Sequence, residues 1–494
     1  MDKLARLLTD AQRRSEQNAA DLAALADRIR LLILDGRIVL GTRLPAEREL
    51  AQHEGVSRTT VAGAYARLRE LGYLRSLRGS GSVARLPAFG AEAAPTIGER
   101  PAPGILDFSK ATLPAIPLVA EAAREAAELL PAHLHLTGFD PLGLDELRQA
   151  IADRYTARGL PTETDEIMVT LGAQHAIALV ARTLLSRGDR ALVEAPSYPH
   201  AVEALLTAGA RLVTVPVTTD EGWDQEAIDQ VFPRTAPALA YLMTDFHNPT
   251  GRTMGAEQRA RLLRLAAATG TVVIADETMA ELGFGPAAEL LPPLALGAAA
   301  AGADVVTLGS VGKSIWGGMR LGWIRADREL IARFGVARLA GDLGSPVLEQ
   351  LVLLRLLDHY DRVLDARREQ LRAGHALLAA ELTRRFPTWR VPEVQGGLSL
   401  WVNLGEPVSS QLALAARARG LLVGAGPRFG LDGSFERFLR LPFCHPAAIT
   451  LPAVDLLEEA WAAVASSSSR GLRPLLSSTM AWGCMRSSCS RNCV

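Results

Sequence analysis

From residue 167 onward, short runs of β-branched and other apolar residues alternate with stretches of helical spacing, and this alternation constrains the fold more than any other feature. The runs, which we predict to be strands, are Ile167–Val169, Ala191–Val193, Leu212–Val215, Ala240–Met243, Thr271–Ile274 and Asp304–Thr307. Strands that alternate with helices in this way build a sheet with helices packed against it. The sequence therefore predicts a large α/β domain.

The last of these strands delivers a lysine into a loop of small residues. After Thr307 the chain runs through Gly and Ser residues, including Ser310, to Lys313, and Arg320 follows seven residues later. An amine whose pKa is lowered by a cationic neighbour can bond to an aldehyde, while hydroxyl and guanidinium groups hold a phosphate. The loop therefore fits a cofactor with both groups. The alternative is a loop lysine exposed to solvent.

Four other strands also end in residues suited to a ligand, and ligands of open α/β sheets gather at such ends. Gly172-Ala173-Gln174 follows the first strand at a predicted helix start, where free amides can hold a phosphate. Tyr198 lies between two prolines and offers a ring for stacking, although a turn tyrosine is the alternative explanation. Asn248 presents an amide from a turn, and Asp276 ends an apolar strand. An acid there would pair with a protonated pyridine nitrogen.

The order of these motifs resembles that of the fold type I pyridoxal-phosphate enzymes, the aspartate aminotransferase superfamily. The matching set is Gly172-Ala173-Gln174, Tyr198, Asn248-Pro249-Thr250-Gly251, Asp276, Ser310 with Lys313, Arg320 and finally Arg440. The resemblance covers about residues 106–465. It implies a mixed seven-stranded sheet, a smaller C-terminal α/β subdomain and pyridoxal 5'-phosphate as the cofactor.

The same resemblance assigns a role to each residue. It implies that Lys313 is the catalytic, Schiff-base lysine and that Asp276 is the partner of the ring nitrogen. Asn248 would bind the phenolic oxygen and Tyr198 would stack on the ring. The implied phosphate ligands are Ala173, Gln174, Ser310 and Arg320. Arg440 matches the arginine that binds a substrate carboxylate, with a structural ion pair as the alternative.

Two positions depart from the family pattern. Just after Asp276 the family usually has a tyrosine that supports the ring oxygen, whereas this chain has Glu277, Thr278 and Met279. Phe139 stands where a tyrosine of the neighbouring subunit often reaches the phosphate. These departures bear on catalytic tuning and on the strength of cofactor binding.

The N-terminal part has a different pattern. Apolar spacing predicts a helix from Asp21, a second helix over Ala46–Glu54 that ends at Gly55, and a third helix capped by Ser57. Residues 73–83 then read as two short strands around a glycine-containing tip. Residues 56–85 contain six arginines and one acid, a charge excess that is typical either of a DNA-binding surface or of a solvated face.

These elements closely resemble the winged helix-turn-helix of the GntR family of bacterial regulators. The resemblance rests on residues 41–51, 56–61 and 71–74. It implies that the third helix enters the major groove of double-stranded DNA, with its N-terminal end against the bases. The implied DNA-binding residues are Arg48, Ser57, Arg58, Thr59 and Thr60, with Arg78 and Gly79 in the wing. A helical hairpin with exposed arginines is the alternative.

Composition sets the remaining boundaries. Four prolines and no apolar periodicity mark residues 86–104 as a linker, and a serine run begins a predicted disordered tail at Ser466. The predicted parts are thus an N-terminal tail (1–20), the DNA-binding domain (21–85), the linker (86–104), the cofactor domain (105–465) and the C-terminal tail (466–494). We expect no metal site, because the three crowded cysteines of the tail lack a zinc spacing. A net charge of −1, no long apolar segment and no signal peptide predict a cytoplasmic protein.

A GntR-type reader joined to an aminotransferase-like domain resembles the MocR subfamily of bacterial transcription regulators. This implies a homodimer that binds an operator and responds to pyridoxal phosphate or to its adduct with a small amino compound. It also implies a place on the bacterial nucleoid. Two alternatives remain open: an active aminotransferase that carries a DNA-binding module, and a domain without cofactor that serves only to dimerise.

Overall fold

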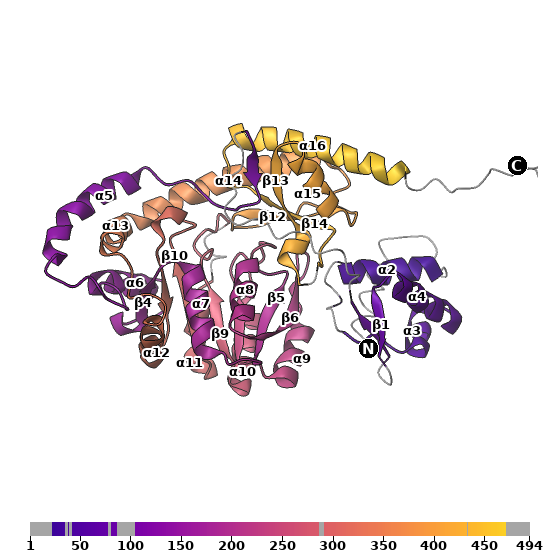
Figure 1. Ribbon diagram of the computed structural model, residues 1–494, viewed down its shortest axis with the longest axis horizontal. Helices are drawn as coiled ribbons and strands as arrows, with labels where there is room; N and C mark the ends of the chain where they lie inside the picture. Colours follow the sequence, from indigo (N-terminus) through magenta and orange to yellow (C-terminus); the bar gives the residue numbers. More distant parts are fainter. Residues whose placement is uncertain are drawn as a thin grey trace, which may run out of the picture.

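The computed structural model describes residues 22–34, 38, 42–77, 81–85, 104–285, 291–431 and 433–470. The predicted wing residues Arg78 and Gly79 lie outside the described residues, as do the predicted N-terminal tail and the linker up to residue 103. In Figure 1 the described residues from 22 to 85 form a body of their own, and those from 104 to 470 form a large sheet domain with a smaller subdomain against it.

The N-terminal body consists of α2 (Leu22–Leu34), α3 (Glu47–Glu54), α4 (Arg58–Glu70), β1 (Leu74–Leu77) and β2 (Gly81–Ala84). As predicted, Ser57 caps α4, because its side chain accepts a hydrogen bond of 3.0 Å from the amide of Thr60. Gly55 ends α3 in the left-handed region at φ 67°. The two strands pair antiparallel, and the helices enclose a core that includes Ile29, Val61 and Leu68. The body is a winged helix-turn-helix.

The large sheet has the strand order β4-β11-β10-β9-β8-β5-β6-β7. Its strands are β4 (Ile167–Thr170), β5 (Arg190–Ala195), β6 (Arg211–Thr218), β7 (Gly222–Trp223), β8 (Leu239–Leu242), β9 (Val272–Asp276), β10 (Val305–Ser310) and β11 (Gly322–Arg325). The central pairs from β10 to β6 are parallel, whereas β11 and β7 run antiparallel to their neighbours. The predicted seven strands are present. The two-residue β7 is an eighth, formed because the chain turns back and pairs Trp223 with Val217.

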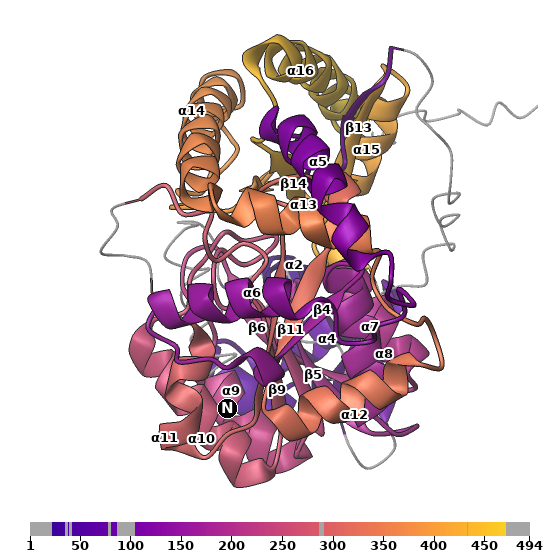
Figure 2. The ribbon, with the colours of Figure 1, turned by 90° about the vertical axis from the view of Figure 1, so that its left-hand side faces the viewer.

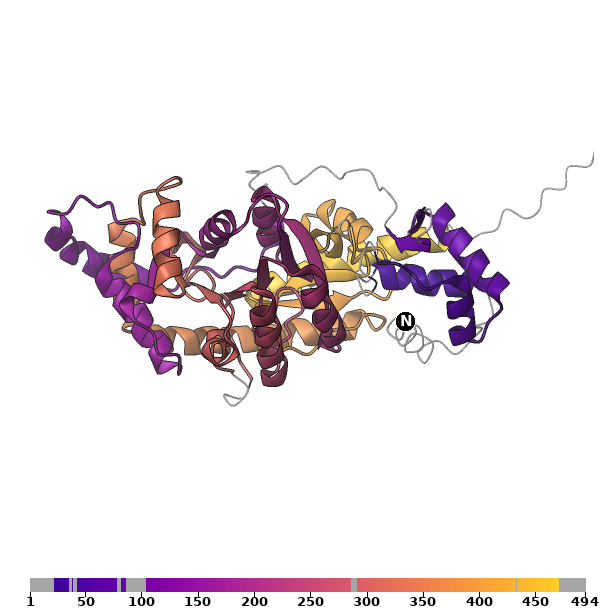
Figure 3. The same ribbon diagram turned by 90° about the horizontal axis from the view of Figure 1, so that it is seen from below.

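Helices cover both faces of this sheet. Figure 2 shows α9 (Gln225–Thr235), α10 (Ala256–Thr269) and α11 (Ala298–Ala301) on one side of the strands. On the other side lie α7 (Ala173–Leu184), α8 (Pro199–Thr207) and α12 (Arg328–Arg338), and the view from below in Figure 3 also shows helices on both sides. α6 (Asp145–Ala157) packs near β4. Because both faces are covered, the central strands are almost wholly buried, and their carboxyl ends meet along one edge.

The smaller subdomain draws on both ends of the cofactor domain. Its sheet has the order β12-β14-β13-β3, with strands β3 (Leu106–Phe108), β12 (Ser399–Asn403), β13 (Leu421–Ala425) and β14 (Phe438–Pro442). The helices of this part are α14 (Tyr360–Arg385), α15 (Ser409–Arg417) and α16 (Ala447–Arg470), whereas α5 (Leu118–Leu129) and α13 (Val347–Leu357) pack against each other and α13 also packs against α6. α16 continues to Arg470, so the predicted tail boundary at Ser466 was too early. The serines there extend a helix whose earlier turns are packed against α14 and α15. None of the described helices is long and apolar enough to cross a membrane.

Candidate functional site

A cavity of about 220 Å³ opens where the carboxyl ends of the central strands face the smaller subdomain. All of the residues predicted to bind a cofactor line it, although they come from six separate segments. They are Ala173, Gln174, Tyr198, Asn248, Asp276, Ser310, Lys313 and Arg320, and Arg440 joins them from β14. The topology therefore brings together the residues that the sequence motifs single out.

Lys313 lies in the turn after β10. Its Nζ donates a hydrogen bond of 2.8 Å to the carbonyl oxygen of Ala111. Burial, assisted by the positive charge of Arg440, lowers the pKa of the lysine to about 8. The turn is held by Ser310, whose hydroxyl accepts from Gly312 N and donates to Leu321 O, both at 3.1 Å. The result is a buried amine that is close to its neutral, nucleophilic form at physiological pH.

Asp276 is the last residue of β9 and is 3% exposed. Its Oδ2 accepts a hydrogen bond of 2.6 Å from the hydroxyl of Tyr241, and its Oδ1 accepts one of 3.0 Å from the amide of Thr278. Burial raises the pKa of the Asp276 carboxyl, and the two donors oppose that rise by favouring the ionised form. Each carboxylate oxygen keeps a further lone pair, so the acid can accept a proton-bearing ring nitrogen from the cavity.

The opposite end of the cavity can hold a phosphate. Gly172 caps α7 at φ 99°, and a Cβ there would lie 3.4 Å from Nη2 of Arg320. The left-handed φ favours glycine at this position, and the guanidinium lies beside the start of α7, where Ala173 and Gln174 are found. Arg320 donates to Leu171 O at 2.9 Å, which leaves its other N–H groups for a ligand. Amides at a helix start together with a guanidinium form an anion site.

The middle of the cavity is framed by Tyr198 and Asn248. Tyr198 caps α8, and burial, followed by the charge of Asp276, raises the pKa of its hydroxyl. Asn248 is 7% exposed, and its Oδ1 accepts a hydrogen bond of 3.3 Å from Arg440. The turn before Asn248 is braced by the buried Glu194, which accepts hydrogen bonds from Trp223 Nε1 at 2.7 Å and from the amide of Met243.

Arg440 is a buried cation whose hydrogen-bond partners among the described residues are an amide oxygen and a backbone carbonyl, with no carboxylate. Its guanidinium donates to Asn248 Oδ1 and to the carbonyl of Ser109, and its Cζ lies 4.7 Å from the centre of the Phe429 ring. Its Nε is buried with no hydrogen-bond partner in the described chain. Burial and the nearby Arg428 lower the pKa of Arg440 to about 10. A buried cation that lacks a counter-ion is suited to an anionic ligand such as a carboxylate, and the predicted alternative of a structural ion pair has no support here.

A partly buried network of polar side chains supports the phosphate end of the cavity. His175, on the first turn of α7, accepts a hydrogen bond from Leu171 N at its Nδ1, and its Nε2 lies 2.9 Å from Oδ2 of Asp342. The other oxygen of Asp342 accepts from the fully buried Arg338 at 2.6 Å. Arg338 also donates to the carbonyl oxygen of Val169 in β4 at 2.7 Å. Burial lowers the pKa of His175, which favours a neutral ring with its proton on Nε2.

The sequence patterns did not identify several residues of the site. Tyr241 lies in a buried strand, and a buried tyrosine hydroxyl usually needs a partner, which is a signal that could have drawn attention to it. Ala111 contributes only a backbone carbonyl, for which the sequence has no signature. Thr278 and Met279 line the cavity where the family usually has its tyrosine.

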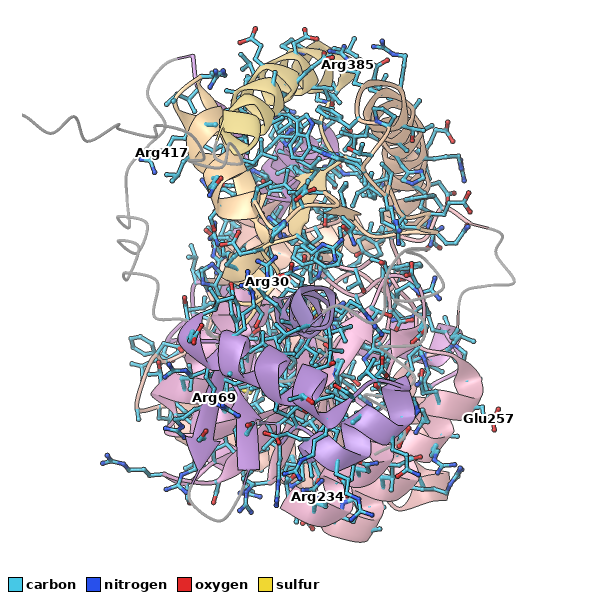
Figure 4. The ribbon with its side chains drawn as sticks, turned by 90° about the vertical axis from the view of Figure 1, so that its right-hand side faces the viewer. Arg30, Arg69, Arg234, Glu257, Arg385 and Arg417 are labelled. Atoms are coloured by element: carbon cyan, nitrogen blue, oxygen red, sulfur yellow. The ribbon has the colours of Figure 1, made fainter. Side chains whose placement is uncertain are left out.

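The predicted DNA-binding residues lie at the start of α4 and on α3. The side chain of Arg58 is 75% exposed, with Glu47 Oε2 at 3.7 Å. Arg48 and Thr59 are also exposed, whereas the hydroxyl of Thr60 lies 2.8 Å from that of Ser57 and belongs to the cap. Figure 4 shows Arg69 on the same helix and Arg30 on α2. The exposed start of α4 is therefore free to approach a DNA groove.

Comparison with known proteins agrees with both halves of the chain. Residues 104–455 match the family described as aminotransferase class I and II, and residues 23–83 match the bacterial regulatory proteins of the gntR family. The HTH-type transcriptional regulator TauR of Rhodobacter capsulatus is 30% identical over 468 residues, which cover 84% of this chain and 92% of TauR. The probable rhizopine catabolism regulatory protein MocR of Rhizobium meliloti is 30% identical over 334 residues, 63% of this chain and 66% of MocR.

A solved structure gives the same result for the cofactor domain. The α-aminoadipate aminotransferase LysN from Thermus thermophilus, crystallised with N-(5'-phosphopyridoxyl)-L-leucine, superposes with a TM-score of 0.68 at 30% identity. The match covers 74% of this chain and 94% of LysN. The cavity has the amine, acid and anion site that such a ligand requires, and the cofactor that these similarities imply is pyridoxal phosphate.

Proposed function

With a GntR-family domain joined to an aminotransferase class I and II domain, the chain belongs to the MocR-type regulators, and we propose that it couples the occupancy of its cofactor cavity to binding of an operator. The observation that carries the proposal is the buried Lys313 amine. It lies in one cavity with the Asp276 carboxylate, an anion site and Arg440, which has no carboxylate partner among the described residues. The same chain carries an N-terminal DNA-binding domain.

The residues of the cavity have separate tasks. Pyridoxal phosphate, when bound, supplies an aldehyde that bonds to amines and a ring that withdraws electrons. Lys313 provides the amine for attachment, and Asp276 holds a proton at the ring nitrogen. Arg320, Ser310 and the amides of Ala173 and Gln174 hold the phosphate, while Asn248 binds the phenolic oxygen and Tyr198 packs on the ring. Arg440 binds the carboxylate of an amino compound, which is the effector.

The proposed coupling is a difference in affinity between two arrangements of the chain. An effector can shift DNA binding only as far as it binds the DNA-competent and incompetent arrangements with different free energies. Couplings of this kind commonly change affinity by about 5-fold to 150-fold. Because its ligand is chromosomal DNA, we place the protein on the bacterial nucleoid in the cytoplasm.

We also propose a homodimer, which would present two DNA-binding domains to paired half-sites of the operator. An exposed apolar face supports this: Leu134, Leu136, Phe139, Val336, Leu339, Leu343 and Leu348 all show large solvent-exposed fractions. The two segments that carry the face adjoin, since Arg338 donates to the carbonyl of Pro141 at 2.9 Å and a Cβ on Gly344 would lie 2.3 Å from Asp140 O. Apolar faces of this extent on soluble proteins usually mark interfaces.

The test is operator binding by the full chain. Affinity for a labelled duplex from the protein's own promoter is measured by fluorescence anisotropy, with and without pyridoxal phosphate, against a random duplex of equal length. We expect a preference for the promoter and a change of at least about fivefold on cofactor addition, which is absent in Lys313→Ala. Equal affinity for both duplexes, or a cofactor effect of the same size in Lys313→Ala, would sink the proposal.

An active aminotransferase with a DNA-binding module is the second candidate, because the cavity contains every group that transamination needs. Incubation with an amino acid and a keto acid separates the two. Many turnovers per site would favour the enzyme, and at most a single exchange per site would favour the regulator.

A further inference from the structure

A second arginine lies beside the carboxylate-binding Arg440 and has no assigned task. Arg428 belongs to the short 3-10 turn Gly426–Phe429, which follows β13. Its side chain is exposed, and it makes no ion pair or hydrogen bond with any described residue. Burial lowers the pKa of Arg440 most, and the positive charge of Arg428 lowers it further. The two guanidinium groups therefore act on the same small region.

The 3-10 turn is firmly placed against the cavity. The ring of Phe429, the next residue, lies 4.7 Å from Cζ of Arg440, and the carbonyl of Phe429 accepts a hydrogen bond of 2.8 Å from Ser197 N. Ser197 directly precedes the cavity residue Tyr198. The 3-10 turn thus contacts both the residue that precedes Tyr198 and the side chain of Arg440, and Tyr198 and Arg440 both line the cavity.

The start of the same turn is equally constrained. The amide of Gly426 donates to Ser409 Oγ at 3.0 Å, and a Cβ on Gly426 would come within 1.9 Å of the carbonyl oxygen of Phe435. Only glycine fits at this point, so the turn cannot shift outward without breaking its packing. The backbone that carries Arg428 is therefore held in place beside residues that line the cavity.

The positive charges in and beside the cavity outnumber the anionic groups that a cofactor and an effector with one carboxylate would supply. Arg320 is assigned to the cofactor phosphate and Arg440 to one carboxylate of the effector, while Asp276 is assigned to the ring. Arg428 remains as an exposed cation next to Phe429, whose ring packs against the guanidinium of Arg440, the group assigned to the first carboxylate. Guanidinium groups bind carboxylates in bidentate pairs, which makes them selective for that group.

We propose that Arg428 binds a second carboxylate of the effector, so that the site selects amino dicarboxylic acids over amino acids with a neutral side chain. This inference rests on the proposed function, because it concerns the effector of the same cavity. In this arrangement the first carboxylate binds the buried Arg440, and the second binds the exposed Arg428. Since exposed ion pairs are screened by water and salt, the contribution of Arg428 should be modest and should fall as ionic strength rises.

The experiment titrates the full-length, cofactor-loaded protein with three pairs of amino acids and follows cofactor absorption and heat of binding. The pairs are aspartate with asparagine, glutamate with glutamine, and 2-aminoadipate with its side-chain amide. Within a pair the two molecules have nearly the same shape and differ in the charge of the far group. We expect at least one dicarboxylate to bind about fivefold to tenfold more tightly than its amide at low salt, with the preference shrinking at high salt.

Variants of Arg428 test whether this residue causes the preference for dicarboxylates over their amides. Arg428→Gln should abolish it and leave the affinity for the amides within about twofold, whereas Arg428→Lys should retain part of it. Arg234→Gln is the matched control. Arg234 is also exposed, but it lies in the last turn of α9, which leads into the start of β8, at the opposite edge of the sheet from the cavity. Figure 4 shows it at the bottom of the large domain.

Two results would overturn the inference. One is a wild-type protein that shows no preference in any pair or no response to any of the six compounds. The other is an Arg428→Gln variant that keeps the full preference. If the protein still takes up pyridoxal phosphate and binds its promoter in a cofactor-dependent way, either result removes only the amino dicarboxylate effector. A protein that does not take up the cofactor would instead remove the proposed function itself.

Discussion

The hydroxyl of Tyr241 donates a hydrogen bond of 2.6 Å to Oδ2 of Asp276. The two residues lie on the neighbouring parallel strands β8 and β9, with Tyr241 opposite Ile274 in the register. Burial alone favours the neutral acid, and it also raises the pKa of Tyr241, so the phenol remains a donor at all ordinary pH values. The phenol thus stabilises the charge on the carboxylate that pairs with a ring nitrogen.

Replacing this phenol should weaken the cofactor site more than the fold. In Tyr241→Phe the carboxylate loses a donor, and hydrogen bonds to charged groups are worth about 1.5 to 3 kcal/mol. We expect affinity for pyridoxal phosphate, measured by fluorescence quenching, to fall by about tenfold or more. Tyr155→Phe is the control: Tyr155 is also buried, but its hydroxyl accepts from Trp323 Nε1 and does not line the cofactor cavity. Equal losses of affinity in both variants would contradict this role.

The rate at which the cofactor attaches should depend on pH through Lys313. Only the neutral amine attacks an aldehyde, and with a pKa of about 8 roughly a tenth of the lysine is neutral at pH 7. The rate should therefore rise with pH and level off above about pH 8, as followed by stopped-flow absorbance after mixing apoprotein with pyridoxal phosphate. In Arg440→Gln the neighbouring positive charge is removed, so the midpoint should move to higher pH. A midpoint that does not move would mean that burial alone sets the pKa.

Operator binding should depend on Arg58 at the exposed start of α4. If its guanidinium reads a base, Arg58→Ala should cost about 1 to 3 kcal/mol of binding free energy, measured by anisotropy at fixed salt concentration. Arg30→Ala serves as the control, because Arg30 lies on α2 and pairs with Asp27 at 3.2 Å. Unchanged binding by Arg58→Ala would place this arginine on a solvated surface.

The apolar face should control subunit association. Leu339, which is 54% exposed, belongs to this face, and a carboxylate there would have to be desolvated on dimerisation. We expect Leu339→Glu to be monomeric at micromolar concentration by sedimentation velocity, while Leu414→Glu remains dimeric. Leu414 is 61% exposed but lies on α15, away from the face. A dimeric Leu339→Glu protein would locate the interface elsewhere.

The sequence predicted the elements whose signals are local. Ser57 and Gly55 occupy the caps that their residue types favour, and the six predicted strands all exist as β4, β5, β6, β8, β9 and β10. Asp276 and Lys313 could be expected in one place because the carboxyl ends of parallel strands meet at one edge. These predictions needed the order of motifs along the chain and little else.

What escaped prediction depends on packing between distant segments. The contact between Tyr241 and Asp276 follows from strand register, which no local pattern specifies. The strand β3 joins the smaller subdomain from the far end of the domain, since Leu106 pairs with Leu421. The tail was predicted to begin at Ser466, whereas α16 continues to Arg470, because packing of the earlier turns of the helix overrides the weak helix propensity of serine.

The half-buried pair of His175 and Asp342 connects the cofactor's anion site to the segment that carries the apolar face. His175 lies on the first turn of α7, and Asp342 lies between Leu339 and Leu343. A subunit that docks on those leucines would press on the same short loop whose carboxylate orients the imidazole. Dimer formation and phosphate binding would then both depend on the position of this loop. A variant with a weakened dimer interface would therefore release its cofactor more readily than the intact dimer.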